Sequence, residues 1–260
     1  NDMNWLGQML ERGWVVTATD YAGLGTDGTS RYLIGKDEAR DVLNSVRAAR
    51  VLSNSAGNRF SLFGHSQGGH SVLWSSTEAA AYAPELNLVA TAAAAPAAEL
   101  PSLFREQYRS PVAWGIGADV VATWPSVYPN LPLEGVVTNR GIRSSDQLSQ
   151  DCVKQALTQI LVRKELRQEF FEVDPMTNAA WRQAATEQTP AAVPGRVPLL
   201  MVQSLADQIV LPNTTALYVR TACDAGSTIQ TLWLDKVQHQ DEAIVAGPTV
   251  VQWFGDRFAN

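Results

Sequence analysis

The pentapeptide Gly64-His65-Ser66-Gln67-Gly68 is the feature that most restricts how this 260-residue chain can fold. It follows a short apolar run at residues 60–63 and precedes a helix-compatible stretch at residues 69–82. A G-x-S-x-G sequence between a strand and a helix is typical of a sharp turn that exposes a serine hydroxyl. Its glycines remove side chains that would collide with the flanking elements. The pattern therefore predicts Ser66 as a nucleophile on such a turn.

Short apolar runs alternate with amphipathic stretches along much of the chain. In residues 36–52, apolar side chains recur at intervals of three and four, and charged residues, Glu38 among them, fill the other positions, as in an amphipathic helix. Strands alternating with helices predict a mostly parallel sheet covered on both faces. The predicted strands are residues 14–19, 60–63, 87–95, 197–203 and 229–234, and the predicted helices are residues 36–52, 69–82, 214–222 and 241–254.

The alternation stops between residues 96 and 195. Prolines interrupt an aromatic stretch there, and one clear helical pattern covers residues 151–171. We interpret this region as a mostly helical insert, so that residues 1–95 and 196–260 form the core.

A serine hydroxyl needs a base to take its proton, and histidine is the usual one. The chain has three histidines. His65 directly precedes Ser66, so its side chain points away from the hydroxyl, and His70 lies on the helix that follows. His239 remains, in the loop after the predicted strand 229–234, and we predict it to be the base.

The third member should be an acid that follows a strand and lies between the serine and the histidine in the chain. Asp207 meets both conditions, because it follows the predicted strand 197–203 after a short loop. Asp235, at the same strand end as His239, and Asp224, in a polar turn, are the alternatives.

These residues predict two-step ester hydrolysis, in which the backbone N–H of Gln67 stabilises the oxyanion and no metal or cofactor takes part. An acyltransferase with the same three residues and a non-catalytic binding protein are the alternative functions. A further set of aromatic residues in the insert could receive an acyl chain or form the insert's own core: Phe104, Trp114, Trp124, Tyr128, Phe170, Phe171 and Trp181.

The charge and hydropathy of the chain argue against nucleic-acid binding and against a membrane-spanning helix. The net charge is −6, and the basic residues are mixed with acidic ones, which is not the footprint of a nucleic-acid-binding surface. The most apolar stretch, residues 86–100, contains Pro96 and Glu99 and is shorter than a membrane-spanning helix. We therefore expect neither nucleic acid as a partner nor a transmembrane segment.

The segment from Gly23 to Gly28 matches the dinucleotide-binding pattern G-x-G-x-x-G. That pattern binds a pyrophosphate only where it joins a strand directly to a helix. Three residues separate it from the predicted strand 14–19, and no helical pattern begins at Gly28. We interpret it as a glycine-rich loop at the rim of the site.

Longer segments resemble the secretory lipases of the α/β-hydrolase superfamily, the group that includes the fungal lipase A type. The resemblance spans residues 5–95 and 196–245. It implies an α/β-hydrolase fold with Ser66, Asp207 and His239 as nucleophile, acid and base. It also implies a helical cap at residues 96–195, a small-molecule ester or lipid substrate, and a secreted or periplasmic location. The segments that carry it are ATDYAGLGT, GKDEARDVLNSVRAAR, FGHSQGGHSVLWSS, AAAYAPELNLVA, and ADQIVLPNTTALYVRTAC with VQHQD.

The resemblance also implies that N-terminal strands of the fold are missing from this chain, together with a loop that supplies the first oxyanion-hole amide. We expect a separate N-terminal polypeptide, cleaved from the same precursor or supplied as another chain, to fill the slot between residues 14–19 and 60–63. On their own, Cys152 and Cys223 are compatible with one bridge, two free thiols or ligands to an absent group. By analogy with the family, Cys152 would pair with a cysteine of the missing part.

Overall fold

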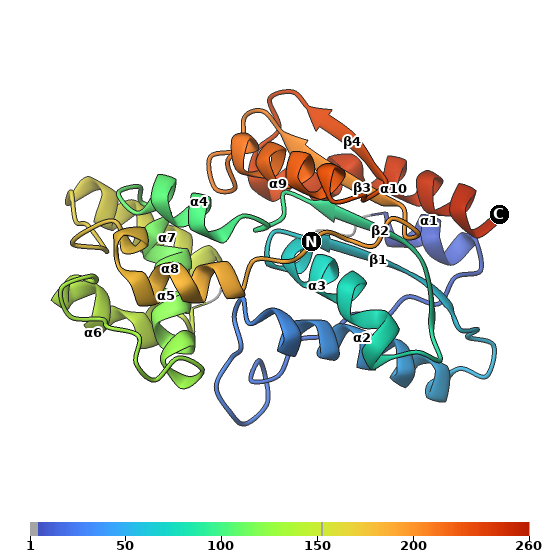
Figure 1. The fold of residues 1–260 in the computed structure, drawn as a ribbon, viewed down its shortest axis with the longest axis horizontal. Coiled ribbons are helices and arrows are strands. Elements are labelled where there is room, and N and C mark those ends of the chain that lie inside the picture. The colour runs from blue at the N-terminus through green and yellow to red at the C-terminus, as the bar shows by residue number, and fades with distance from the viewer. Residues whose placement is uncertain (1–4, 152, 260) are drawn as a thin grey trace. The chain divides into compact units, whose positions relative to one another are not determined.

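Four parallel strands form one sheet in this computed structural model, which describes residues 5–151 and 153–259. Their order in the sheet is their order in the chain (Figure 1), and they are β1 (Arg59–His65), β2 (Asn87–Ala94), β3 (Leu199–Ser204) and β4 (Ile229–Leu234). Because every pairing is parallel, the carboxyl ends of all four strands lie at one edge of the sheet. The four corresponding strand predictions are confirmed, with small differences at the ends.

Helices cover both faces of the sheet, and the side chains of a strand alternate between them. On β3, Leu199 and Met201 join one hydrophobic core, and Leu200 and Val202 join the other. This period of two is expected of a strand buried on both faces. The first core includes α2 (Gly35–Leu52), α3 (Gln67–Tyr82) and α9 (Pro212–Asp224), and the second includes α1 (Leu6–Glu11) and α10 (Glu242–Ala259). The predicted helices α2, α3, α9 and α10 are therefore confirmed.

The chain divides into two units. The sheet and its helices belong to unit 1, which comprises Asn1–Gly28, Gly35–Glu99 and Pro190–Asn260, whereas unit 2 comprises Thr29–Ile34 and Leu100–Thr189. Unit 2 begins and ends a few residues inside the predicted insert and also includes residues 29–34. Its helices are α4 (Leu100–Gln107), α5 (Ala113–Thr123), α6 (Asn139–Leu148), α7 (Val153–Glu165) and α8 (Ala179–Glu187).

The helix predicted over residues 151–171 is too long. It ends at Glu165, and Arg167 has a φ of +50°, a left-handed conformation that a right-handed helix cannot continue through. Phe171 instead forms an isolated β-bridge with Val137. Cys152, for which a disulfide was expected, lies outside the described residues, and Cys223 is an exposed free thiol.

Aromatic rings pack together in the interior of unit 2. The Trp124 ring lies 5.7 Å from that of Phe104 and 6.2 Å from that of Trp181, and the Trp114 ring lies 5.2 Å from that of Phe170. All five side chains, together with Phe171, are at most 3% exposed. Of the two interpretations of these rings, the structure supports a core that belongs to the insert itself.

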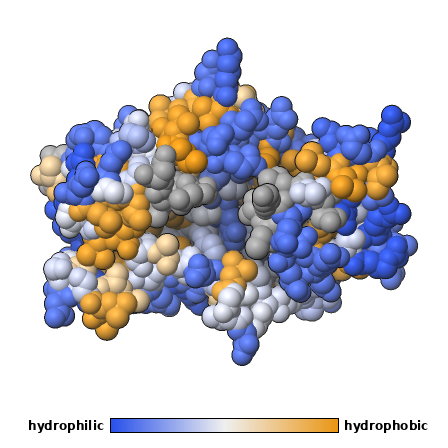
Figure 2. All heavy atoms as spheres, turned by 180° about the vertical axis from the view of Figure 1, so that it is seen from behind, coloured by the Kyte–Doolittle hydropathy of each residue, from blue (hydrophilic) through white to orange (hydrophobic). Residues whose placement is uncertain are grey.

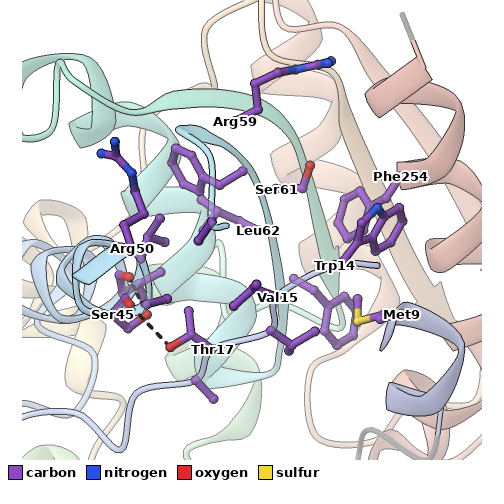
Figure 3. A pocket seen from close by; sticks show the side chains of 18 of the residues that line it. Met9, Trp14, Val15, Thr17, Ser45, Arg50, Arg59, Ser61, Leu62 and Phe254 are labelled. Atoms are coloured by element: carbon purple, nitrogen blue, oxygen red, sulfur yellow. Dashed lines mark hydrogen bonds between the residues drawn. The ribbon is translucent and has the colours of Figure 1, made fainter. Parts of the chain in front are cut away.

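Residues 14–19 do not form a strand, so this prediction is wrong. A strand requires ladder hydrogen bonds to a neighbour, and no described strand pairs with this segment. Its Trp14 N–H instead donates to the Met9 carbonyl at 3.3 Å. A cavity of about 380 Å³ lies between the segment and β1 (Figure 3), lined also by α2 and by Phe254 and Phe258 of α10. Within the described chain, β1 is therefore paired on one side only, by β2.

On one face of the molecule, hydrophobic residues form several separate patches. On the face shown in Figure 2, orange patches are separated by hydrophilic residues. The most exposed large hydrophobic side chains include Val51 and Leu52, at the end of α2. None of the described helices has both the length and the apolar content to cross a membrane.

The central position of β3 leads to a prediction for stability. Leu200 is 1% exposed, so replacing it with alanine should leave a cavity and lower the free energy of unfolding by about 2–5 kcal/mol in urea denaturation. Leu205→Ala is the matched control, because Leu205 is 60% exposed and its truncation should change this energy by about 0.5 kcal/mol or less. Equal effects of the two substitutions would contradict the assigned core.

Candidate active site

Ser66 occupies a left-handed turn between β1 and α3. Its φ and ψ angles are +56° and −116°, and its N–H donates to the carbonyl of Ala94 at 2.9 Å. Few residues other than glycine adopt such a conformation, and a serine held in it at a strand end has its hydroxyl raised above the sheet edge. The turn predicted from the pentapeptide is therefore present in the structure.

The glycines around the turn have unequal importance. A Cβ atom at Gly64 would lie 1.9 Å from the Gly68 carbonyl oxygen, so no side chain fits there. A Cβ atom at Gly68 would meet nothing closer than the Tyr21 hydroxyl at 3.9 Å. At Gly69, a Cβ atom would lie 2.8 Å from the Pro96 Cα. The expectation that both glycines of the pentapeptide are needed for space is thus correct for Gly64 and wrong for Gly68, and Gly69 is the second crowded position.

The structure brings the three residues predicted as nucleophile, base and acid together. The Ser66 Oγ lies 3.0 Å from His239 Nε2, and His239 Nδ1 lies 2.7 Å from Asp207 Oδ2. They follow β1, β4 and β3 respectively, so the parallel sheet places all three at its carboxyl edge. An Nδ1–H that donates to Asp207 leaves Nε2 unprotonated, as an acceptor for the serine hydroxyl.

Asp207 is held as a carboxylate by several donors. Burial by itself raises the pKa of Asp207, but the hydrogen bond and charge of His239 and the N–H of Ile209 outweigh it, so the pKa is lowered overall. Asp207 Oδ1 accepts hydrogen bonds from Ile209 N–H at 2.8 Å and Val210 N–H at 3.1 Å. The side chain is 3% exposed. The acid therefore remains ionised and fixed in one orientation beside the imidazole.

The two alternative acids are exposed. The side chain of Asp235 is 76% exposed and lies 3.9 Å from Lys236. Asp224 is the last residue of α9 and is also exposed. Of the three candidate acids, Asp207 is the one that is hydrogen-bonded to His239.

The other two histidines contact the site in different ways. The ring centroid of His65 lies 4.7 Å from that of His239, so His65 packs against the imidazole. Sequence analysis missed this contact, because residues adjacent in a turn give no signal of a partner that lies far away in the chain. His70 is buried on α3 with its Nδ1 2.9 Å from Glu38 Oε2.

Glu38 is a second residue that sequence analysis misplaced. It was expected on the polar face of α2, but it is 1% exposed and accepts hydrogen bonds from Gln67 Nε2 at 2.7 Å and Ser71 Oγ at 2.8 Å. Glu38 lies one residue before the buried Ala39, on the apolar side of the helix. This position in the sequence pattern could have indicated that Glu38 is buried. The carboxylate thereby ties α2 to the first turn of α3.

The position of Gln67 is fixed by a side-chain hydrogen bond and by its place at the start of α3. Its side chain is bound to Glu38, and it is the first residue of α3. Backbone N–H groups in the first turn of a helix have no acceptor within the helix and carry partial positive charge. The N–H of Gln67, next to Ser66, therefore has the orientation and charge suited to an anionic oxygen.

The glycine-rich loop from Gly23 to Gly28 is not followed by a helix at Gly28. The next helix, α2, begins at Gly35, and Gly23 N–H donates to Thr26 Oγ1 at 3.2 Å within the loop. The expectation that this segment lacks the strand-to-helix setting of a dinucleotide site is confirmed.

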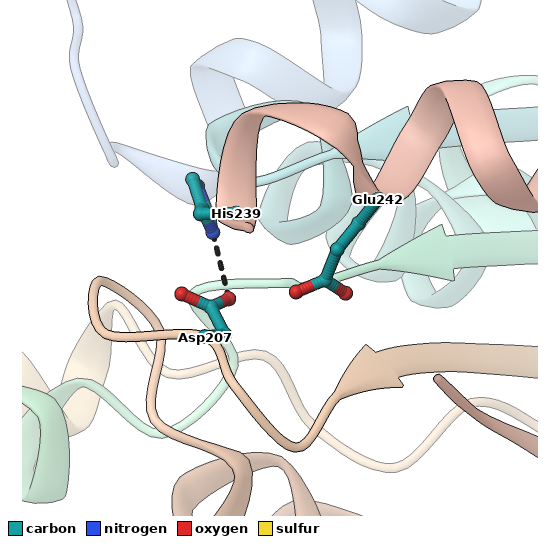
Figure 4. A group of neighbouring side chains, drawn as sticks. All are labelled: Asp207, His239 and Glu242. Carbon is teal, nitrogen blue, oxygen red and sulfur yellow. Dashed lines mark hydrogen bonds and ion pairs between the residues drawn. The ribbon is translucent and has the colours of Figure 1, made fainter. Parts of the chain in front are cut away.

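Asp207, His239 and Glu242 form a compact buried group (Figure 4). Their potential ligand atoms all lie within 4.8 Å of one another, close enough in principle to surround one cation. Hydrogen bonds already account for the arrangement, because Asp207 Oδ2 lies against His239 Nδ1 and Glu242 Oε2 accepts the Ser204 N–H at 2.8 Å.

Comparison with known proteins assigns the chain to a family. The model of the secretory lipase family matches residues 1–260. The chain belongs to the secretory lipase family. The crystal structure of Candida antarctica lipase A in its closed state matches this fold with a TM-score of 0.76 and 20% identity, over 98% of this chain and 61% of that chain. The α/β-hydrolase fold expected from the sequence is confirmed by this likeness.

Two curated relatives show how the family varies. A secreted triacylglycerol lipase of Malassezia globosa is 23% identical over 95% of this chain. A probable inactive lipase of Mycobacterium tuberculosis is 27% identical over 96% of this chain. The chain spans 56% of the length of each of these two proteins.

The close approach at Gly64 leads to a test of the turn. Gly64→Ala should lower the free energy of unfolding by about 3 kcal/mol or more, because the new methyl group would overlap the Gly68 backbone, which cannot move away as a flexible side chain could. Gly68→Ala should change it by about 1 kcal/mol or less, since the nearest atom is 3.9 Å away. Chemical denaturation of both variants checks the prediction, and equal losses would show that the turn is packed differently.

Proposed function

We propose that this secretory lipase family member hydrolyses carboxylic esters, with Ser66 as the nucleophile, His239 as the base and Asp207 as the acid that orients it. The observation that carries the proposal is the continuous set of hydrogen bonds from Asp207 through His239 to a serine in a left-handed turn. A serine hydroxyl becomes an effective nucleophile when a neutral imidazole accepts its proton as the new bond forms.

The proposed reaction has two steps. The Ser66 Oγ attacks the ester carbonyl carbon while its proton passes to His239 Nε2, and the resulting oxyanion is stabilised by the N–H of Gln67. The tetrahedral intermediate expels the alcohol, which takes the proton from His239, and an acyl-enzyme remains. Water then attacks the acyl carbon, His239 accepts its proton, and the acid leaves as the Ser66 hydroxyl is restored.

The substrate class is proposed from the family. The family name and the triacylglycerol lipase relative support an uncharged ester or lipid as substrate and a protein exported from the cell. None of the three proposed catalytic side chains needs a cofactor for this chemistry.

A non-catalytic binding protein is the second candidate, because one relative carries the name probable inactive lipase. The two functions differ in whether Ser66 can become acylated. A fluorophosphonate reacts with an activated serine and leaves an unactivated one unmodified, so it separates them without knowledge of the natural ester.

Ser66→Ala should abolish fluorophosphonate labelling and lower kcat for a nitrophenyl ester by about 10⁶-fold, because loss of the nucleophile removes the function of all three residues. Ser61→Ala is the matched control, since Ser61 lies on β1 away from the turn, and this variant should be labelled and active like the wild type. Intact mass and initial rates provide the measurements. A folded wild-type protein that forms no adduct would favour the binding protein.

We also propose that an additional extended polypeptide, the N-terminal fragment expected above, pairs with β1. Support comes from the cavity beside β1 (Figure 3). One of its walls is the edge of β1 that pairs with no described strand, and another is residues 14–19, which form no strand. An exposed strand edge readily accepts a further strand, because its N–H and C=O groups lack partners.

If this pairing occurs, the active preparation should contain a second polypeptide besides the 28.2 kDa chain, and native mass spectrometry should detect both in one complex. Backbone amides of β1 should exchange hydrogen more slowly in the complex than in the isolated chain, because they gain acceptors. A fully active preparation with the 28.2 kDa species alone would refute the proposal.

A further inference from the structure

Glu242 is a buried carboxyl group next to the proposed catalytic residues, and the mechanism does not use it. It is the first residue of α10 and is 0% exposed. Its Oε2 accepts the Ser204 N–H at 2.8 Å, and its Oε1 lies 3.5 Å from Gln203 Nε2. Its carboxyl group lies beside that of Asp207, on the side of the oxygen that is hydrogen-bonded to His239 (Figure 4).

Two facing carboxyl groups cannot both be ionised at low energetic cost in a buried site. Asp207 is the ionised group of the two, because its negative charge is stabilised by hydrogen bonds from His239 and from the N–H groups of Ile209 and Val210. Glu242 is the partner that must remain neutral. Burial, and next the hydrogen bond and charge of Asp207, raise the pKa of Glu242 to about 9.

A neutral carboxylic acid has one O–H donor and one carbonyl acceptor. Glu242 Oε2 accepts the Ser204 N–H, and Oε1 accepts a long hydrogen bond of 3.5 Å from Gln203 Nε2. A carboxyl oxygen of Glu242 also lies within 4.8 Å of one of Asp207, and a hydrogen bond between the two side chains contributes to the pKa shift of Glu242. We propose that Glu242 is a positioning residue that, as a neutral acid, donates a hydrogen bond to Asp207 and so fixes the carboxylate that orients His239. The effect on catalysis rests on the proposed function, whereas the neutral state of Glu242 does not.

Few charged groups surround Glu242. Asp207 faces it from the loop after β3, His239 on the short turn before α10 is hydrogen-bonded to Asp207, and Asp241 precedes Glu242 but is exposed. The other side chain facing it from β3 is the uncharged Gln203. The charge state of Glu242 is therefore set by its burial and by Asp207.

A raised pKa predicts how stability depends on pH. An unfolded Glu ionises near pH ~4.3, whereas Glu242 in the folded protein keeps its proton up to about pH 9. The contribution of the proton to stability is complete below the unfolded pKa and is lost progressively as pH rises to the folded pKa. Glu242→Gln, which cannot ionise, should therefore gain Tm relative to the wild type from pH 5 to 9, with no further gain above about pH 9.

Kinetics of three variants test the positioning role. Glu242→Gln retains a donor and an acceptor, so its kcat at pH 7 should remain within about threefold of the wild type. The wild type should lose rate near pH 9 as Glu242 ionises, and Glu242→Gln should not. Glu242→Leu retains neither, and its kcat should fall about 10- to 100-fold with little change in KM. Asp241→Asn removes an exposed charge one residue away and should behave like the wild type throughout.

The outcomes separate the inference from the proposed function. Parallel Tm profiles of the wild type and Glu242→Gln between pH 5 and 9 would contradict the inference that Glu242 is protonated in the folded protein. An unchanged kcat in folded Glu242→Leu would contradict the inference that Glu242 positions Asp207. A wild type that turns over no ester would contradict the proposed function, and the Tm profiles, which need no substrate, would still decide whether Glu242 is neutral.

Discussion

A serine at a φ of +56° can belong neither to the strand before it nor to the helix after it, and this constraint organises the site. The left-handed turn ends β1, starts α3 at the next residue and lifts the Ser66 hydroxyl above the carboxyl edge of the sheet. Since β3 and β4 run parallel to β1, the loops that follow them reach the same edge with Asp207 and His239. Absence of a side chain at Gly64 lets the chain turn this tightly.

Two buried glutamates border this edge, and each holds a different part of the site. Glu38 accepts hydrogen bonds from Gln67 Nε2 and Ser71 Oγ and lies 2.9 Å from His70 Nδ1. Glu242 is fully buried beside another carboxyl group, and burial together with the neighbouring Asp207 raises its pKa to about 9, which suits a neutral acid. One glutamate therefore supports the turn that carries the serine, and the other supports the acid that orients the histidine.

Local patterns predicted much of this arrangement. The pentapeptide marks the turn at Ser66, elimination among three histidines singles out His239, and the strand before Asp207 selects that acid over Asp235. Long-range contacts were not accessible in the same way. Glu38 and Glu242 look like ordinary charged residues of amphipathic helices, because their burial depends on what packs against the helix. The β-branched run at residues 14–19 has strand propensity but no strand beside it in the described chain, and propensity without a partner forms no ladder.

The tautomer of His239 is the most direct test of the account, because every proposed role depends on a proton at Nδ1 and none at Nε2. Nitrogen-15 NMR of imidazole-labelled protein near neutral pH distinguishes the two ring nitrogens. The account predicts a protonated Nδ1 with a strongly low-field proton signal that is lost in Asp207→Asn, and an unprotonated Nε2 facing Ser66. A His239 protonated at Nε2 and unprotonated at Nδ1 would contradict it.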